Sequence, residues 1–207
     1  MAENGLPYAL IMEKGSVAAE SLDQPPPPAP PSGFFEDRTN GSERPARAAA
    51  LKAVLGCAPD DAAIIATTGK TGRELFTLED RRQQLYQVGS MGCASAMGLG
   101  VALNSTRPVI VIDGDGAALM KMGTLATIAA YAPQNLVHLI LDNGVHDSTG
   151  GQATVSPGVS FAAAAQACGY RTSYLCDSLA GFEESMRDAL AAAKPALIHL
   201  RTAPGSM

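Results

Sequence analysis

Two apolar runs, each ending in a short turn with an acid or amide side chain, constrain the fold of this chain more than any other feature. Residues 109–112 are Val-Ile-Val-Ile, and Gly-Asp-Gly follows at 114–116. Residues 136–141 are Leu-Val-His-Leu-Ile-Leu, and Asp-Asn-Gly follows at 142–144. Short apolar runs bounded by turn residues are typical of strands that are buried on both faces.

The segment between these predicted strands has the spacing of a helix. Within residues 117–132, the apolar positions Leu119, Met122, Ala126 and Ala129 recur at helical intervals, which predicts one helix. A strand, a turn, a helix and a second strand in this order predict two parallel strands. Ligands bind outside the carboxyl ends of such strands, so the side chains that follow both strands are expected to face one crevice.

Oxygen-bearing side chains at this edge indicate a site for a metal ion and a phosphate group. Asp115 offers a carboxylate, Asn143 offers an amide oxygen, and a backbone carbonyl follows closely in the sequence. Mg2+ uses few protein oxygens and completes its shell with phosphate and water. The flanking glycines permit close backbone approach, and the helix after Gly116 offers free N–H groups to an anion.

A tight turn between a strand and a helix is the alternative explanation of Gly-Asp-Gly taken alone. The dinucleotide-binding fingerprint is excluded, because its third glycine would fall at position 119, which is Leu119. Asn143 favours a ligand site, because two unrelated turns need not place oxygen ligands side by side.

Length and charge limit the classes of protein to which the chain can belong. Its 207 residues, 46% of them hydrophobic, suffice for one domain with extensions or at most two small domains. The net charge is -5 and there is no basic cluster, so nucleic-acid binding is not expected. An acidic chain that binds a phosphorylated ligand needs local positive potential, which again indicates a metal ion and helix N-termini.

The cysteines and the apolar runs indicate a cytoplasmic protein. Cys57, Cys93, Cys168 and Cys176 show no C-x-x-C spacing and lie in or beside apolar segments, which predicts buried free thiols in a reducing compartment. Residues 1–12 lack a basic start followed by an apolar core, so no signal peptide is expected. No apolar run approaches the roughly 20 residues of a membrane span.

Composition divides the chain into three parts. Residues 1–14 contain one short apolar stretch with strand character, at 8–12, which we interpret as the remnant of a preceding domain. Residues 15–43 include a proline-rich run and predict a flexible, extended linker. Residues 44–207 form the predicted compact domain, which starts near Ser42, a candidate cap for a first helix.

The remaining elements alternate between strand and helix. Beyond the unit described above, we predict helices at 46–55, 93–103, 160–168 and from Leu179 to a stop at Pro195, with strands at 62–67, 170–175 and 196–201. A Gly-, Ser- and Thr-rich loop is expected at 144–158. The alternation predicts an α/β fold: a doubly wound parallel sheet with helices on both faces.

The chain resembles a known family, the thiamine-diphosphate-dependent 2-oxo-acid decarboxylases. Gly-Asp-Gly at 114–116, followed after a helix-length segment by Asp142-Asn143, is similar to the cofactor motif of that family. The resemblance implies the diphosphate-binding (PP) domain fold. It also implies that Asp115, Asn143 and the Val145 carbonyl bind Mg2+, and that the Gly116 and Ala117 N–H groups hold the diphosphate.

A second segment carries the same resemblance. Residues 89–92, Gly-Ser-Met-Gly, are similar to the segment over which the family bends its cofactor, with the bulky apolar side chain supplied by Met91. Gly89 would offer its carbonyl to the aminopyrimidine. A core methionine beside a helix start is the alternative for Met91 taken alone. The full set of implied cofactor-binding residues is Thr68, Gly69, Gly89, Ser90, Met91, Gly114, Asp115, Gly116, Ala117, Asn143, Val145 and His146.

Longer matches point to one branch of the family. Residues 67–76, 88–92 and 142–152 resemble phosphonopyruvate decarboxylases, with sulfopyruvate decarboxylases next, and residues 146–152 are the most specific part. The resemblance implies that donors in this loop contact an anionic substrate, and the candidates are His146, Ser148, Thr149 and Gln152. The alternative is that the Ser, Thr and Gln only shape the loop.

Three further polar features have roles that the sequence predicts less directly. His138 and His199 lie inside apolar runs and are interpreted as structural. Arg73-Glu74 fits either a surface ion pair or a contact with substrate.

The resemblance also implies a partner. The family's full chain has a pyrimidine-binding domain that supplies the glutamate activating the cofactor, and no glutamate with that setting is visible here. We therefore expect the diphosphate-binding (β) subunit of a split decarboxylase that converts phosphonopyruvate to phosphonoacetaldehyde and CO2. A separate pyrimidine-binding (α) subunit would complete a hetero-oligomer. The family's basic C-terminal tail is also not matched.

Two alternatives remain open from the sequence. One is a sulfopyruvate decarboxylase β subunit, and the other is a non-catalytic regulatory subunit that keeps the cofactor fold.

Overall fold

A parallel sheet of seven strands forms the centre of the computed structural model, which describes residues 9–21, 33–192 and 195–206. The strand order is β1-β8-β9-β5-β4-β2-β3, and each neighbouring pair is parallel. The strands are β1 (Phe34–Asp37), β2 (Ala63–Ala66), β3 (Gln84–Tyr86), β4 (Val109–Gly114), β5 (Leu136–Asp142), β8 (Thr172–Cys176) and β9 (Ala196–Arg201). The predicted α/β fold with a doubly wound parallel sheet is confirmed.

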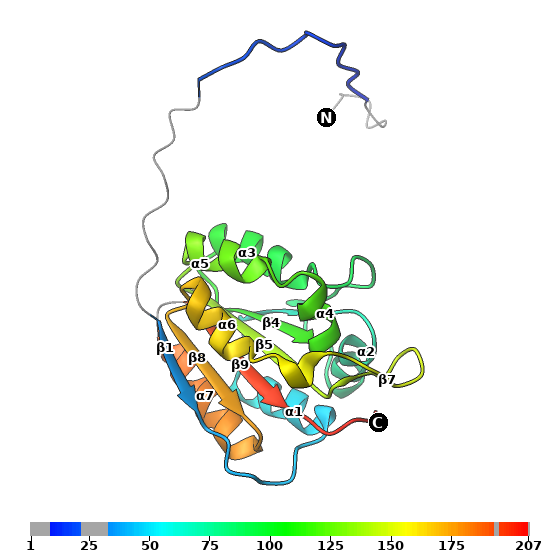
Figure 1. Cartoon of the computed structure of the whole chain (residues 1–207), viewed down its shortest axis with the longest axis vertical. Helices are drawn as coiled ribbons and strands as arrows, with labels where there is room; N and C mark the ends of the chain where they lie inside the picture. Colours follow the sequence, from blue (N-terminus) through cyan, green and yellow to red (C-terminus); the bar gives the residue numbers. More distant parts are fainter. Residues whose placement is uncertain (1–8, 22–32, 193–194, 207) are drawn as a thin grey trace.

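Helices cover both faces of the sheet, with α3, α5 and α6 on one side and α1 and α7 on the other (Figure 1). The helices are α1 (Arg47–Cys57), α2 (Lys70–Leu78), α3 (Ala94–Leu103), α4 (Asp115–Met120), α5 (Thr124–Tyr131), α6 (Phe161–Cys168) and α7 (Leu179–Ala191). Because successive strand residues point to opposite faces, β4 serves two cores. Ile110 and Ile112 pack in the core under α1 and α7, whereas Val109 and Val111 pack in the core under α3, α5 and α6.

The central strands β4 and β5 are buried along almost their whole length. They pair in register, with Val109 opposite Leu136 and Gly114 opposite Leu141. Their carboxyl ends therefore lie side by side at one edge of the sheet. This pairing brings the two turn segments predicted from the sequence to the same place.

The predicted single helix at 117–132 is wrong, because the structure divides it into α4 and α5. Lys121 leaves the helical conformation (φ -133°, ψ 38°), and α5 begins only after Gly123. The buried face of α5 consists of Leu125, Ile128 and Ala129, whereas the predicted Ala126 is exposed. The break lets α4 follow the crevice edge while α5 packs on the sheet.

The predicted linker boundary at residue 43 also requires correction. Residues 34–37 form the edge strand β1, which pairs with β8, so the folded region begins before Ser42. Ser42 does not cap a helix, since the position before α1 is Ala46, which makes no side-chain cap. Residues 9–12 are exposed and form no strand, and Tyr8 lies outside the described residues.

Several smaller elements were not predicted from the sequence. They are α2, β3 and a hairpin of β6 (Val145–His146) and β7 (Gln152–Ala153), which is followed by a 3-10 turn at Ser156–Gly158. The helix predicted at 160–168 is α6, which begins at Phe161 and is capped by the Ser160 side chain. The four cysteines are free as predicted, although only Cys176 is buried and the other three are half-buried. Among the described residues, no helix is long and apolar enough to cross a membrane.

Two glycines of α3 allow a matched test of how closely this helix packs on the sheet. A Cβ added at Gly98 would lie 2.2 Å from the Val111 Cγ2 atom of β4, whereas nothing lies within 4 Å of a Cβ at Gly100. We expect Gly98→Ala to lower the free energy of unfolding by about 1–3 kcal/mol through overpacking. Gly100→Ala should raise it by about 0.5–1 kcal/mol through helix propensity. Urea unfolding of both variants measures the difference, and equal effects would contradict the packing.

Candidate functional site

The crevice at the carboxyl ends of β4 and β5 gathers most of the residues singled out from the sequence. Asp115 begins α4 directly after β4, and Asn143 follows β5. One cavity is lined by Arg47, Thr67, Thr68, Gly69, Lys70, Thr71, Met91, Gly114, Asp115, Gly116, Ala117, Leu141, Asn143, Val145, His146, Asp147 and Ser148. The structure therefore brings together the three predicted metal ligands and most of the predicted cofactor-binding residues.

Four predicted site residues do not line this cavity. Gly89 and Ser90 precede Met91 in the neighbouring loop, where Ser90 adopts a left-handed conformation (φ 51°). Thr149 and Gln152 are exposed and bond to each other across the hairpin turn, with Gln152 Nε2 donating to the Thr149 carbonyl at 2.9 Å. The alternative that these two residues shape the loop agrees with this geometry.

The Asn143 side chain has a defined orientation. Its Nδ2 group donates to Asp147 Oδ2 at 2.7 Å, and its Oδ1 atom accepts from the Val145 N–H at 3.1 Å. The amide oxygen retains a second lone pair. Asn143, Val145 and Asp147 all line the crevice.

Asp115 is buried and is held by the loop that follows the hairpin. Thr154 Oγ1 donates to Asp115 Oδ2 at 2.5 Å. Burial raises the pKa of the Asp115 carboxyl above its usual range, and the nearby Asp142 charge adds to this rise, whereas the hydrogen bond from Thr154 opposes it. A carboxylate that is desolvated in this way favours a counter-ion such as a metal cation.

Asp142 anchors the site from the last residue of β5. Burial alone would raise the pKa of this carboxyl, but hydrogen bonds from His199 (2.9 Å) and Ser156 (2.6 Å) outweigh burial and lower the pKa. His138 lies deeper in the same strand and contacts Asp113 at 3.0 Å. Both histidines are buried and paired with carboxylates inside the sheet, in agreement with the structural role predicted for them.

The ends of two side chains lie close over Gly116 at the start of α4. A Cβ there would lie 2.6 Å from the His146 Cε1 atom and 3.3 Å from the Met91 Cε atom. Gly92 is similarly tight, since its Cβ would lie 2.7 Å from the Ala117 carbonyl oxygen. The loop that carries Met91 is thus held against the first turn of α4.

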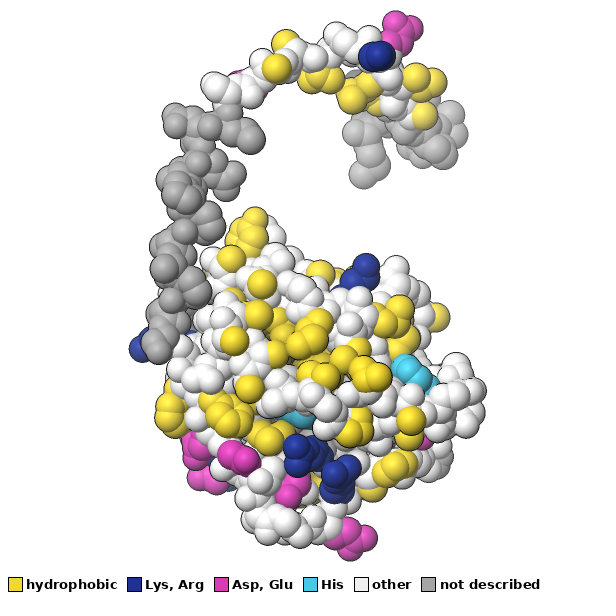
Figure 2. Space-filling model, in the orientation of Figure 1, with side chains coloured by type: hydrophobic (Ala, Val, Ile, Leu, Met, Phe, Trp, Pro, Cys, Tyr) yellow, Lys and Arg dark blue, Asp and Glu magenta, His cyan; other side chains and the backbone are white. Residues whose placement is uncertain are grey.

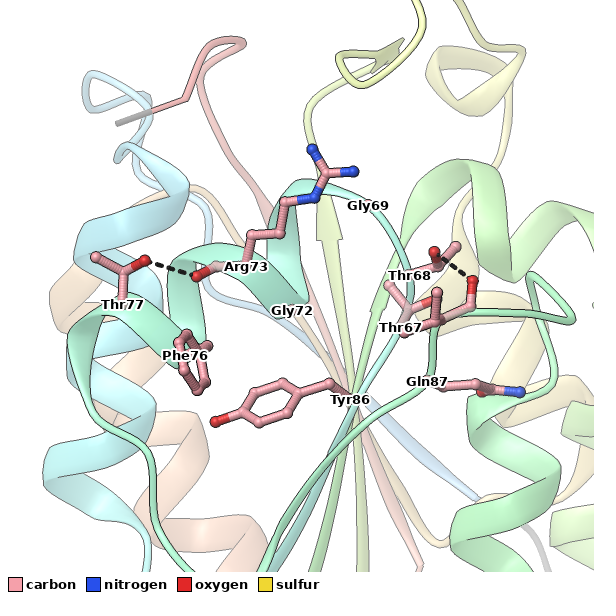
Figure 3. Close-up of a pocket in the computed structure, with 10 residues that line it drawn as sticks. Thr67, Thr68, Gly69, Gly72, Arg73, Phe76, Thr77, Tyr86 and Gln87 are labelled. Carbon is pink, nitrogen blue, oxygen red and sulfur yellow. Dashed lines mark hydrogen bonds between the residues drawn. The ribbon is translucent and has the colours of Figure 1, made fainter.

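A second cavity, of about 340 Å³, opens beside the crevice and shares Thr67, Thr68 and Gly69 with it. Figure 3 shows Arg73 projecting from α2 at its rim, with the Phe76 and Tyr86 rings facing each other. These rings are arranged edge to face at 5.6 Å between centroids.

Arg73 and Glu74 diverge in the structure. Arg73 is exposed at the cavity rim, whereas Glu74 is buried and pairs with Arg47. Of the two side chains, only Arg73 lines the cavity and is placed to contact a ligand there.

Six residues that line the crevice were not among the predicted site residues, namely Arg47, Thr67, Lys70, Thr71, Leu141 and Asp147. Asp147 could have been found from the sequence, because it lies only four residues after Asn143. Nothing near Arg47 in the sequence indicated a site residue, since Arg47 begins α1 and reaches the crevice only through the fold.

The donor set fits a small hard cation. Asp115, Asn143 and the Val145 carbonyl offer only oxygen atoms, which suits Mg2+. No group of three or more His, Cys, Asp or Glu residues that would favour another metal occurs within the described ranges. Nearby, the buried Thr67 hydroxyl has no hydrogen-bond partner in the described part of the chain, as expected for a group that meets a ligand.

Comparison with known proteins agrees with this geometry. Residues 65–200 match the thiamine pyrophosphate enzyme, C-terminal TPP binding domain. The chain belongs to this family of thiamine-diphosphate enzymes, and the crevice occupies the part of the fold that the match covers.

Individual relatives narrow the comparison to decarboxylases. The chain is 52% identical over its whole length to phosphonopyruvate decarboxylase of Streptomyces hygroscopicus and 49% identical to that of Streptomyces viridochromogenes, and it spans about half of each (52% and 53%). Sulfopyruvate decarboxylase subunit beta of Methanothermobacter thermautotrophicus is 38% identical over 77% of this chain and 83% of that protein.

Solved structures confirm the fold. The thiamine diphosphate-dependent 4-hydroxybenzoylformate decarboxylase of Rhodococcus jostii RHA1 has a TM-score of 0.69 and 26% identity, covering 90% of this chain and 37% of that one. The benzoylformate decarboxylase of Polynucleobacter necessarius gives a TM-score of 0.67 at 14% identity, covering 77% and 33%.

Removal of the Thr154 hydroxyl should shift the titration of Asp115. The hydrogen bond stabilises the charged carboxylate, so Thr154→Val should raise the Asp115 pKa further and cause it to protonate at higher pH. The 13C resonance of the Asp115 carboxyl, followed against pH in the metal-free chain, measures the midpoint. Thr39→Val is the control, because Thr39 donates in the same way to the distant Asp37. An unchanged midpoint in Thr154→Val would contradict this account.

Proposed function

We propose that this chain is the diphosphate-binding part of a thiamine-diphosphate-dependent decarboxylase that converts phosphonopyruvate to phosphonoacetaldehyde and CO2. The observation that carries the proposal is the identity of about half of its residues, over the whole chain, with two phosphonopyruvate decarboxylases. The sulfopyruvate decarboxylase subunits match at lower identity, 38% and 37%, over 77% of the chain.

In this proposal, Asp115, Asn143 and the Val145 carbonyl bind Mg2+. The Gly116 and Ala117 N–H groups, with Thr68 and Gly69, hold the cofactor's diphosphate. Their common lining of one crevice supports these roles. When bound, the cofactor accepts the electron pair that the 2-oxo acid releases as CO2 leaves, and a proton then replaces the carboxylate.

The loop before α3 orients the other end of the cofactor. Met91 lines the crevice and would support the bend between the two rings, while Gly89 would offer its carbonyl to the aminopyrimidine. The left-handed Ser90 and the tight fit of Gly92 against α4 support a rigid loop here. A rigid loop needs little rearrangement during the reaction, so less free energy is required to order the site.

For the substrate, we propose contacts from His146 and Ser148, which line the crevice, and from the cation Arg73 at the rim of the adjoining cavity. Thr149 and Gln152 are assigned to the loop conformation instead. A small 2-oxo acid with a phosphonate group carries a high negative charge, so a guanidinium near the cofactor would help to bind it.

A pyrimidine-binding partner subunit completes the proposed enzyme as a hetero-oligomer. Among the residues described around the crevice, none is a glutamate, so the proton transfer that activates the cofactor is assigned to a glutamate of the partner. The sulfopyruvate relatives are named as beta subunits, which supports an assembly of this kind.

Exposed apolar side chains also support assembly. Hydrophobic side chains spread over the molecular face shown in Figure 2. Over the described residues as a whole, exposed large hydrophobic side chains include Met97, Leu103, Met120, Tyr131 and Val155. We also propose a cytoplasmic location, which the four unpaired cysteines support.

Two alternative functions make different predictions. A sulfopyruvate decarboxylase β subunit would use the same chemistry on a sulfonate. A regulatory subunit would bind its partner without contributing to turnover, although the complete set of Asp115, Asn143 and Met91 in one crevice disfavours this reading.

The test is reconstitution. The purified chain, a candidate pyrimidine-binding chain, thiamine diphosphate and Mg2+ are mixed, and aldehyde formation is followed with phosphonopyruvate and with sulfopyruvate in competition. Turnover of phosphonopyruvate only by the mixture supports the proposal. Preference for sulfopyruvate, or full turnover by this chain alone, would overturn it.

Asp115→Ala distinguishes the enzyme from the regulatory subunit. We expect the variant to lose Mg2+-dependent cofactor binding and turnover, because the only charged metal ligand proposed here is removed. Calorimetric titration of the cofactor with and without Mg2+ measures the loss. Asp61→Ala, which removes an exposed carboxylate elsewhere, should behave like the wild type. Retained turnover in Asp115→Ala would favour the regulatory reading.

Arg73→Ala tests the proposed contact with the substrate's anionic group. A charge-assisted hydrogen bond is worth about 1.5–3 kcal/mol, so we expect KM for phosphonopyruvate to rise by roughly 10- to 100-fold with a smaller change in kcat. Arg82→Ala removes an exposed arginine from the loop after α2 and serves as the charge-matched control. Equal KM values for the two variants would exclude Arg73 from substrate binding.

A further inference from the structure

A single carboxylate oxygen beside the crevice connects three parts of the chain. Asp147 Oδ2 accepts hydrogen bonds from Asn143 Nδ2 at 2.7 Å, from Arg47 Nη1 at 3.0 Å and from the Gly205 N–H at 3.2 Å. None of the roles assigned above requires Asp147 or Arg47. Their contacts nevertheless converge on one of the proposed metal ligands.

A carboxamide has two orientations of similar shape, and only one offers its oxygen to a cation. In the structure, the Asn143 NH2 group faces the Asp147 carboxylate and its oxygen accepts from the Val145 N–H. The reversed carboxamide would place an oxygen against the carboxylate and an NH2 group against an N–H donor. Asp147 therefore selects the orientation, because it tolerates only a donor at this distance.

Asp147 is itself fixed by a buried guanidinium. Arg47 binds Glu74 through two nitrogens, Nε at 3.1 Å and Nη2 at 2.8 Å, which leaves Nη1 directed at Asp147. The Arg47 and Glu74 side chains are both only 6% exposed. A planar, bidentate pair of this kind sets the direction of the remaining donor.

The charges in this network are unequal. One guanidinium meets two carboxylates, those of Glu74 and Asp147. The network therefore has one more carboxylate than guanidinium beside the crevice, where a divalent cation would be bound.

We propose that Asp147 and Arg47 are positioning residues for the metal site: Asp147 turns the Asn143 oxygen toward the cation, and Arg47 holds Asp147 in place. The proposal rests on the metal role proposed for Asn143. Residues that hold a metal ligand from behind commonly change metal affinity by about 10- to 100-fold when they are removed.

The first test needs neither metal nor partner. In the 15N-labelled, metal-free chain, the Asn143 side-chain NH2 protons should exchange slowly and rotate slowly while they are bonded to Asp147. Asp147→Ala should accelerate both processes. Asp147→Asn keeps an oxygen that accepts all three hydrogen bonds and should restore slow rotation. Identical Asn143 resonances in the wild type and Asp147→Ala would overturn the proposal.

The second test measures cation affinity, with Mn2+ as a paramagnetic probe for Mg2+ in the presence of thiamine diphosphate. We expect Asp147→Ala to weaken Mn2+ binding by at least tenfold and Asp147→Asn to weaken it less. Asp188→Ala is the matched control, since it removes a carboxylate that pairs with Arg38 away from the site. Wild-type affinity in Asp147→Ala would overturn the proposal.

Arg47 is tested by the conservative Arg47→Lys, because removal of the whole side chain would take the cation away from both Glu74 and Asp147. Lysine keeps the charge but cannot bind Glu74 bidentately, so faster Asn143 rotation and weaker Mn2+ binding are expected. Arg38→Lys, which alters a guanidinium with carboxylate partners elsewhere, should change neither. Arg47→Lys with wild-type values in both measurements would remove Arg47 from the proposal.

The two measurements separate this proposal from the one on which it rests. If the wild-type chain holds no Mn2+ with the cofactor, the metal role of Asn143 fails. The rotation of its amide then still decides whether Asp147 orients it.

Discussion

The parallel pairing of β4 with β5 is the constraint on which the rest of the structure depends. Both strands are buried on both faces, so their backbone groups must be satisfied within the sheet. In-register pairing then fixes where each strand ends, and the ends carry Asp115 and Asn143. The helices on either face stabilise this pairing by covering the alternate side chains of the same strands. The packing of the core therefore determines where the site lies.

Two polar networks converge on the two side chains at this edge. One starts at His199 in β9, passes through Asp142 and Ser156, and reaches Thr154, which bonds to Asp115. The other starts at Arg47 in α1 and reaches Asn143 through Asp147. Each network joins elements that are distant in the sequence. Asp115 and Asn143 are thus held from two directions, which reduces the reorganisation that binding would otherwise require.

Local sequence patterns predicted the strands β4 and β5, the α/β class and the meeting of Asp115 with Asn143 at one crevice, because each depends on residues within a few positions of one another. The same patterns failed where distant parts of the chain decide the outcome. β1 is a strand because β8 lies beside it, although its own sequence follows a proline-rich run. Helical spacing continued through residues 121–123, yet the backbone breaks there. Arg47 gave no signal, since its partners come from three other segments.

The position of β1 also has a consequence for the order of folding. Residues 34–37 pair with residues 172–175, so this edge of the sheet closes only after the chain has been synthesised through β8. Pairing between such distant segments is slow, because the intervening chain must be ordered first. Until β8 is in place, Phe35 lacks part of the core against which it packs, and a growing chain displays it to its surroundings. β1 is thus synthesised before the strand that secures it, and its protection during synthesis depends on a segment far along the chain.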